Sequence, residues 1–151
     1  MRLLFIVLAI IGSLVLWQGC KTTKHNLNDY EGDQLVFGSG GGFTGMVKEL
    51  TVLPNGQLFK GFGPQPDEQE KIKRRKAKKL FKKAAKLDLI NTKFNKPGNM
   101  YYFIRYKQGD QVNEITWGRE KDKMNDAMDS LFQEFLELIP KSPTKENTTN
   151  Y

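Results

Sequence analysis

The chain has 151 residues, of which 38% are hydrophobic, and a formal net charge of +7. This length allows one domain with a single core and excludes two domains of ordinary size, while ten Phe, five Tyr and two Trp residues favour a packed fold over disorder. The positive charge favours an anionic partner, such as nucleic acid or a membrane surface, and a single cysteine excludes a disulfide within the chain.

The first 20 residues have the organisation of an export signal. Arg2 precedes an apolar run over residues 3–16, which is interrupted only by one Gly-Ser pair. The run has the length of a signal peptide and is shorter than a membrane span of about 20 residues. It leads to Gly19 and Cys20, and polar residues follow at once. The alternative is an uncleaved anchor helix with a free thiol.

The tetrapeptide Trp17-Gln18-Gly19-Cys20 resembles the bacterial lipobox, in which a small residue precedes a lipid-modified cysteine. Trp17 and Gln18 depart from the usual Leu and small residue of that motif. The resemblance implies cleavage after Gly19 and lipidation of Cys20, and two or more acyl chains, at about 0.8 kcal/mol per buried methylene, anchor a protein essentially permanently.

We therefore expect residues 1–19 to be a lipoprotein signal peptide and residues 20–33 to be a lipidated cysteine followed by a polar tether. Lys rather than Asp at position 21 favours the outer membrane of a bacterial cell envelope, facing the periplasm. A chain exported in this way meets the membrane through its lipid and is not expected to bind nucleic acid.

The next part of the chain has the composition of strands and turns. Residues 34–37 predict a short strand, and a glycine-rich bend then leads to a strand over residues 46–53. The sequence Pro-Asn-Gly at residues 54–56 predicts a hairpin turn into a strand over residues 57–60.

A first helix is predicted over residues 67–87. Acidic residues at positions 67, 68 and 70 lie where a helix amino terminus favours negative charge. Apolar residues then recur at helical spacing, namely Ala77, Leu80, Phe81, Ala84 and Leu87.

The last part of the chain predicts a second hairpin and a second helix. Strands over residues 100–107 and 111–117 are joined by Gln108-Gly109-Asp110, and a helix over residues 121–139 ends at Pro140. One side of that helix is apolar, with Met124, Met128, Leu131, Phe135 and Leu138.

Together these elements predict an α+β domain over residues 34–139, with an antiparallel sheet of about five strands and two helices on one face. Residues 140–151 are expected to be a disordered tail.

The glycine-rich segment at residues 40–45 satisfies the pattern G-x-G-x-x-G literally. A dinucleotide site needs a helix directly after the glycines and an acidic residue about 20 positions further on, whereas residues 46–53 have the pattern of a strand. We therefore interpret the segment as a tight bend between strands that exposes Phe43, and no cofactor is expected.

Ten basic residues lie between Lys71 and Lys86, and six like-charged pairs among them are four residues apart. Such pairs destabilise a helix by about 1–3 kcal/mol in sum. The face is a solvated surface, an internal partner of the acidic last helix, or a binding surface for lipid headgroups or an acidic protein. The candidate binding residues are Arg74, Arg75, Lys78, Lys79 and Lys82.

Catalytic constellations are scarce, and no enzyme activity or metal site is expected. His25 is the only histidine and lies in the expected tether, while Cys20 is assigned to lipid. A hydrolase of unknown type, which needs two carboxylates meeting in a cleft, stays an alternative.

Two family resemblances extend beyond the anchor. The run from Phe37 to Gly45, with Pro97-Gly98-Asn99 and Thr116-Trp117-Gly118, resembles small bacterial lipoproteins, and this implies no particular activity. The sequence Gly-Gly-Phe-Thr-Gly at residues 41–45, with the order hairpin, helix, hairpin, helix, is similar to emfourin-type inhibitors of thermolysin-like metalloproteases.

The second resemblance implies that Gly42, Phe43 and Thr44 insert into a partner's cleft. We expect a lipid-anchored, non-enzymatic envelope protein that binds another protein or an anionic surface, with protease inhibition through the glycine-rich loop as the alternative within binding.

Overall fold

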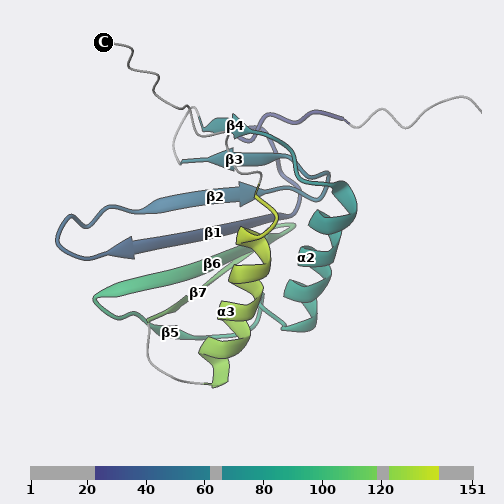
Figure 1. Ribbon diagram of the computed structural model, residues 1–151. Helices are drawn as coiled ribbons and strands as arrows, with labels where there is room; N and C mark the ends of the chain where they lie inside the picture. Colours follow the sequence, from purple (N-terminus) through teal and green to yellow (C-terminus); the bar gives the residue numbers. More distant parts are fainter. Residues whose placement is uncertain (1–22, 62–65, 119–122, 140–151) are drawn as a thin grey trace, which may run out of the picture.

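The computed structural model of the chain describes residues 23–61, 66–118 and 123–139 (Figure 1). The export signal with Gly19 and Cys20, and the expected disordered tail, lie outside these residues. The elements in chain order are β1 (Gln34–Gly41), β2 (Lys48–Val52), β3 (Leu58–Lys60), β4 (Asp67–Gln69), α2 (Arg74–Lys86), β5 (Asn95–Lys96), β6 (Met100–Gln108), β7 (Gln111–Trp117) and α3 (Lys123–Leu136).

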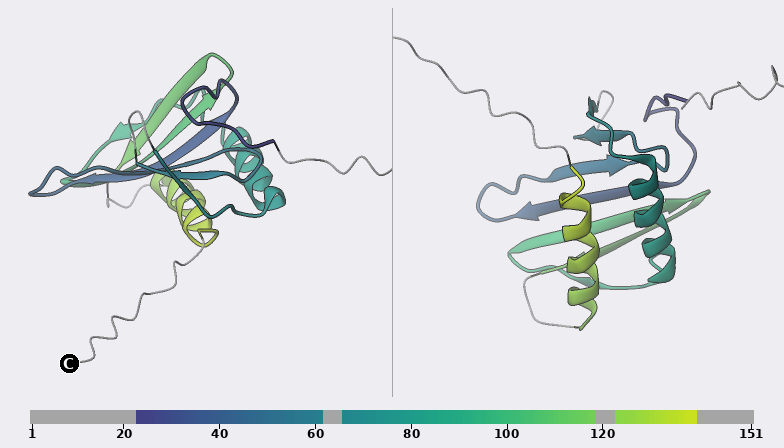
Figure 2. Two further views of the ribbon diagram at one scale, coloured as in Figure 1. Left: turned by 90° about the horizontal axis from the view of Figure 1, so that it is seen from above. Right: turned by 45° about the vertical axis from the view of Figure 1, so that its right-hand side comes forward.

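The strands form one sheet in the order β4-β3-β2-β1-β6-β7-β5. All neighbours are antiparallel except β5 and β7, which are parallel. Both helices cross the same face of the sheet (Figures 1 and 2). The predicted combination of one sheet and two helices is thus confirmed, whereas the predicted antiparallel sheet of about five strands matches only in part, because seven strands form a sheet with one parallel pair.

The two additional strands lack the apolar pattern that marks a strand in a sequence. β5 has only two residues, Asn95 and Lys96, and β4 consists of Asp67, Glu68 and Gln69. Each lies at an edge of the sheet, where a strand has one neighbour and little side-chain burial.

The first helix begins seven residues later than the sequence predicts. Residues 67–69 pair with β3, and the Ile72 amide then donates to the Gly56 carbonyl oxygen at 3.0 Å, so the chain becomes helical only at Arg74. The first turn of α2 consequently contains no acidic residue. The acidic residues that suggested a helix start belong instead to the edge strand and the turn after it.

The core lies between the sheet and the helices. Leu35 and Phe37 on β1 face the helices, and the Phe37 ring stacks on Phe135 of α3 at 4.0 Å between centroids. The apolar residues predicted for the first helix lie in this core, with Ala77, Leu80, Phe81 and Ala84 buried. Met128, Leu131 and Phe135 of the second helix are buried as well, with Leu138 packed against the core, while the Met124 side chain lies outside the described part of the structure.

The segment from Gly38 to Gly41 is strand rather than the predicted bend. Gly38 pairs with Phe103 and Gly40 pairs with Tyr101 across the β1–β6 ladder. A Cβ atom at Gly38 would lie only 2.1 Å from Phe103 Cζ, which shows that the aromatic ring covers the glycine backbone. The glycines thus provide space for aromatic rings on the sheet face away from the helices, and β1 reaches further than the sequence suggests.

The described part of the expected tether lies against the domain. The His25 amide donates to Gln57 Oε1 at 2.8 Å, and Gln57 Nε2 donates to the His25 carbonyl oxygen at 2.9 Å. Lys24 pairs with Glu68 at 2.7 Å, and Asn55 Nδ2 donates to the Thr23 carbonyl oxygen at 2.9 Å. From Thr23 onward the chain is therefore fixed to the strand edge.

None of the helices in the described ranges is both long enough and apolar enough to cross a membrane.

Candidate functional site

The connection between β1 and β2 is a structured loop at the free end of a long hairpin. The Gly45 amide donates to the Gly42 carbonyl oxygen at 3.2 Å, which closes a turn with Phe43 and Thr44 at its centre. Gly45 has a φ of 60°, a left-handed conformation typical of the residue that follows such a turn. The local sequence therefore places Phe43 at the tip.

A second contact holds this loop to the neighbouring strand connection. The Gly42 amide donates to the Asn99 carbonyl oxygen at 2.8 Å. Gly41, with a φ of 96°, passes so close that a Cβ atom would lie 2.1 Å from the same oxygen. Only glycine fits at position 41, because any side chain would collide with the backbone of the other loop.

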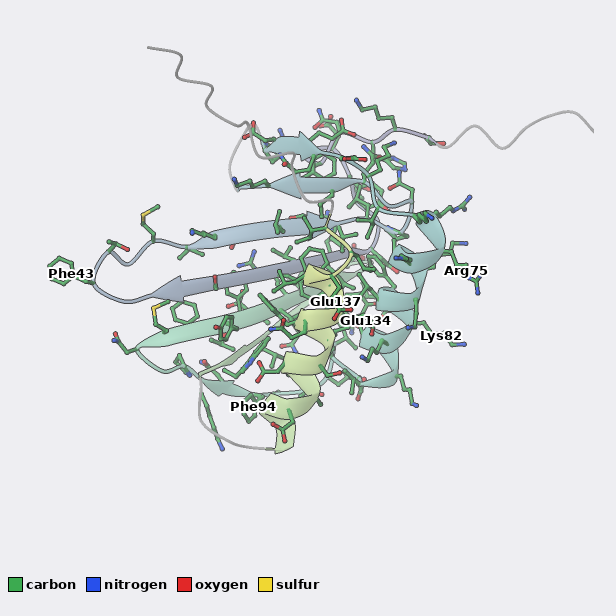
Figure 3. All side chains as sticks on the ribbon, in the orientation of Figure 1. Phe43, Arg75, Lys82, Phe94, Glu134 and Glu137 are labelled. Atoms are coloured by element: carbon green, nitrogen blue, oxygen red, sulfur yellow. The ribbon has the colours of Figure 1, made fainter. Side chains whose placement is uncertain are left out.

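Three exposed apolar side chains gather at this end of the sheet. The Phe43 side chain is fully exposed and points away from the domain (Figure 3), while Met46 is 63% and Met100 43% exposed. Among the described residues only five large apolar side chains are exposed, and these are three of them. The predicted exposure of Phe43 is confirmed, whereas Met46 was assigned to a strand and Met100 was missed because it lies far from Phe43 in sequence.

The basic face of α2 divides into two parts. Lys79 and Lys83 turn toward α3, where their Nζ atoms lie 2.9 and 2.8 Å from the carboxylate of Glu134. Arg75 and Lys82 make no such pair within the described ranges: Lys82 points outward in Figure 3, and Arg75, one turn before Lys79, lies at the exposed rim of the groove between the helices. The internal interpretation of the basic run therefore holds for Lys79 and Lys83.

The outward part has no charge partner within the described ranges. Its exposed residues make no ion pair there, and none has an acidic neighbour in the first turn of the helix. They are Arg74, Arg75, Lys78 and Lys82, that is, four of the five basic residues proposed as binding residues from the sequence.

A groove between α2 and α3 contains the remaining candidates for chemistry. Ser130, Glu134 and Glu137 line it, together with Lys83. Hydrogen bonds from Lys83 and Lys79 hold the pKa of the Glu134 carboxyl below its ordinary value, so this group is ionised and is not a general acid at neutral pH. Lys83 donates to both Ser130 and Glu134 and is therefore not placed to take a proton from Ser130.

Two other carboxylates converge on the sheet face away from the helices. Arg105 lies 2.8 Å from Glu114 and 3.4 Å from Glu49, so one guanidinium links β2, β6 and β7. These carboxylates meet on a cation rather than in a cleft. The arrangement stabilises strand pairing and does not provide the acid and base that a hydrolase needs.

The only histidine has a structural environment. The His25 ring packs on Tyr30 at 4.7 Å between centroids, and its backbone is bound by Gln57. Within the described ranges, no group of three or more His, Cys, Asp or Glu side chains could hold a metal ion.

Comparison with protein-family models gave no match, and no curated protein matched the chain.

Two surfaces of the described residues are candidate binding sites. The first is the Phe43 loop, defined as residues 42–46, which suits an apolar cleft. The second is the outer basic face of α2, which suits an anionic surface. In Figure 3 the labelled residues Phe43 and Arg75 lie at opposite ends of the molecule.

Proposed function

We propose that this chain is a lipid-anchored protein of the bacterial cell envelope that binds another envelope protein through the Phe43 loop and has no enzymatic role. The supporting observation is the fully exposed Phe43 side chain at the tip of a braced loop. Isolated exposed apolar residues are common on protein surfaces, but a cluster at one protruding end is typical of an interaction site.

The loop geometry favours insertion into a cleft. Burial of a Phe side chain stabilises an association by about 1.5–3 kcal/mol. The hydrogen bonds at Gly42 and Gly45 hold the loop in one shape before a partner arrives, and this lowers the entropy lost on binding. The partner would therefore offer an apolar pocket of the size of one aromatic ring.

Partner capture from envelope extracts tests this proposal. Phe43→Ala is expected to weaken capture about 30-fold, the loss that is typical of a central interface residue. Val112→Ala is the matched control, because Val112 is also an exposed apolar side chain but lies on β7. Equal capture by all three proteins would contradict a binding role for the loop.

Protease inhibition is a second candidate, supported by the braced turn around Phe43 and by the resemblance of residues 41–45 to emfourin-type inhibitors. In this case the loop would occupy the substrate cleft of a thermolysin-like metalloprotease. Titration of such a protease with the purified chain should reduce peptide hydrolysis, and Phe43→Ala should restore it. Undiminished hydrolysis at excess wild-type protein would exclude this candidate for that protease.

The anchor is tested at Cys20. The wild-type chain should incorporate labelled fatty acid and sediment with membranes, whereas Cys20→Ala should do neither. If the variant sediments equally and neither form takes up label, the chain is not a lipoprotein.

A further inference from the structure

We propose that the first turns of α2 lie against anionic phospholipid headgroups, so that the lipid anchor holds the domain in one orientation with the Phe43 loop directed away from the bilayer. This inference rests on the proposed lipidation of Cys20. It assigns a different role to each end of the molecule, the membrane to one and the protein partner to the other.

The first step is the short reach between the anchor and the domain. Only Lys21 and Thr22 separate Cys20 from Thr23, and the three residue steps from Cys20 to Thr23 span at most about 11 Å when fully extended. The Thr23 carbonyl oxygen is held by Asn55, and Lys24 by Glu68. A lipidated Cys20 therefore keeps this edge of the domain close to the headgroups instead of letting the domain swing on a long tether.

The second step is the position of α2 relative to that edge. Asn55, which holds Thr23, is followed by Gly56, and the Gly56 carbonyl oxygen accepts from the Ile72 amide two residues before the helix. The views of Figure 2 agree that the described chain begins beside the first turn of α2, while the β1–β2 loop lies at the far end. The anchor thus brings the amino-terminal end of α2 to the membrane.

The third step is the charge of this end. Its exposed residues include Lys73, Arg74, Arg75 and Lys78, which form no ion pair within the described ranges. The helix has no side-chain cap and no acidic residue in its first turn. Headgroup phosphates would neutralise the repulsion among these cations and also suit the positive end of the helix dipole.

An acidic protein is the competing occupant of the basic face. The short link favours lipid, because a membrane within about 11 Å of Thr23 is present at high effective concentration. Glu134 pairs with both Lys79 and Lys83 and offsets one of their two charges, whereas Arg74, Arg75 and Lys78 form no ion pair within the described ranges.

Hydrogen exchange on vesicles tests the orientation. The mature lipidated protein is reconstituted into vesicles of phosphatidylcholine, with or without phosphatidylglycerol. Amides of residues 74–82 should exchange severalfold more slowly when the anionic lipid is present, and the Phe43 loop should exchange equally in both. Equal exchange of residues 74–82 in the two vesicles would overturn the inference.

Two charge-reversal variants, each with three substitutions, provide the control. Arg74→Glu combined with Arg75→Glu and Lys78→Glu should abolish the difference between vesicles. Reversal of three exposed lysines outside α2, namely Lys48, Lys60 and Lys93, changes the net charge equally and should preserve the difference. If both variants lose the difference between the vesicles, the protection of α2 depends on the total charge of the protein and not on this face.

Association without the anchor gives a second measurement. Each basic residue near an anionic surface strengthens binding about fivefold. Removing the charges of Arg74, Arg75 and Lys78 from the Cys20→Ala chain should therefore weaken its binding to phosphatidylglycerol vesicles about 100-fold. An unfolding temperature equal to that of the Cys20→Ala chain would show that the variant without these three charges is folded.

The outcomes separate the inference from the proposed function. A wild-type chain that takes up no fatty acid contradicts the anchor, and the orientation fails with it. An anchored chain with unprotected α2 contradicts the orientation alone. Protection of α2 by an acidic envelope protein, with none from anionic vesicles, would assign the face to that protein instead.

Discussion

The contact between Gly38 and Phe103 explains why the glycine-rich segment remains a strand. Glycine in a strand is normally unfavourable because it loses more conformational entropy on folding than other residues do and has no side chain to pack. Here Phe103 lies across the glycine backbone and is itself buried, with Arg105 5.5 Å from the ring centroid. The aromatic ring thus compensates for the missing side chain, and the β1 strand extends far enough to carry the Phe43 loop.

Substitution of Gly38 tests this packing. Gly38→Ala places a Cβ atom 2.1 Å from Phe103 Cζ, so the ring must move and the free energy of unfolding should fall by about 1–3 kcal/mol. Denaturant unfolding measures the change. In a Phe103→Leu background the same substitution should have a clearly smaller effect, and an equal loss in both backgrounds would show that the ring is not responsible.

At the scale of elements, ion pairs between the helices fix part of the basic face. Glu134 on α3 pairs with Lys79 and Lys83 of α2, and these two ion pairs join the helices within the described ranges. All three groups retain some exposure to solvent, so the pairs stabilise the helix contact by about 1 kcal/mol or less. They mainly orient the basic face.

The pH dependence of stability tests these pairs. The Lys83 and Lys79 hydrogen bonds lower the pKa of Glu134 from its ordinary value of 4.5, so its contribution is present above that pH and is lost as the pH falls through the lowered value. The unfolding free energy of wild type should therefore decrease more in acid than that of Glu134→Gln. Glu137→Gln, one turn further on, should behave like wild type, and parallel curves for all three would contradict the assignment.

Sequence patterns predicted the elements with strong periodicity and missed those that depend on tertiary contacts. The buried faces of both helices and the two hairpins follow from apolar spacing and turn residues. β4 was missed because its acidic residues have the composition of a helix start, and only pairing with Phe59 and its neighbours makes it a strand.

The candidate site was predictable to a similar extent. Phe43 stood out because glycines surround it in sequence. Met100 joins it only through the register that sets Gly41 opposite Met100. The docking of residues 23–33 could not be predicted, since it depends on the buried Gln57 side chain, which is polar and carries no pattern.

At the scale of the whole molecule, the sheet separates the two ends for which we propose binding roles. The β4 and α2 end holds Thr23 and therefore faces the proposed anchor, while the β1–β2 hairpin extends in the opposite direction (Figures 1 and 2). A rigid sheet between the two ends would project Phe43 into the periplasm at a fixed distance from the membrane. Cys20 and Phe43 would then act together, one by localising the protein and the other by binding.

The most direct test of this account is site-specific photo-crosslinking in living cells. A photoreactive phenylalanine analogue at position 43 should yield a discrete adduct with one envelope protein, and the same analogue at position 112 should not. Cys20→Ala should reduce the adduct, because the chain is then no longer held at the membrane. No adduct from position 43, or adducts of equal yield from both positions, would contradict the claim that the Phe43 loop is the recognition surface.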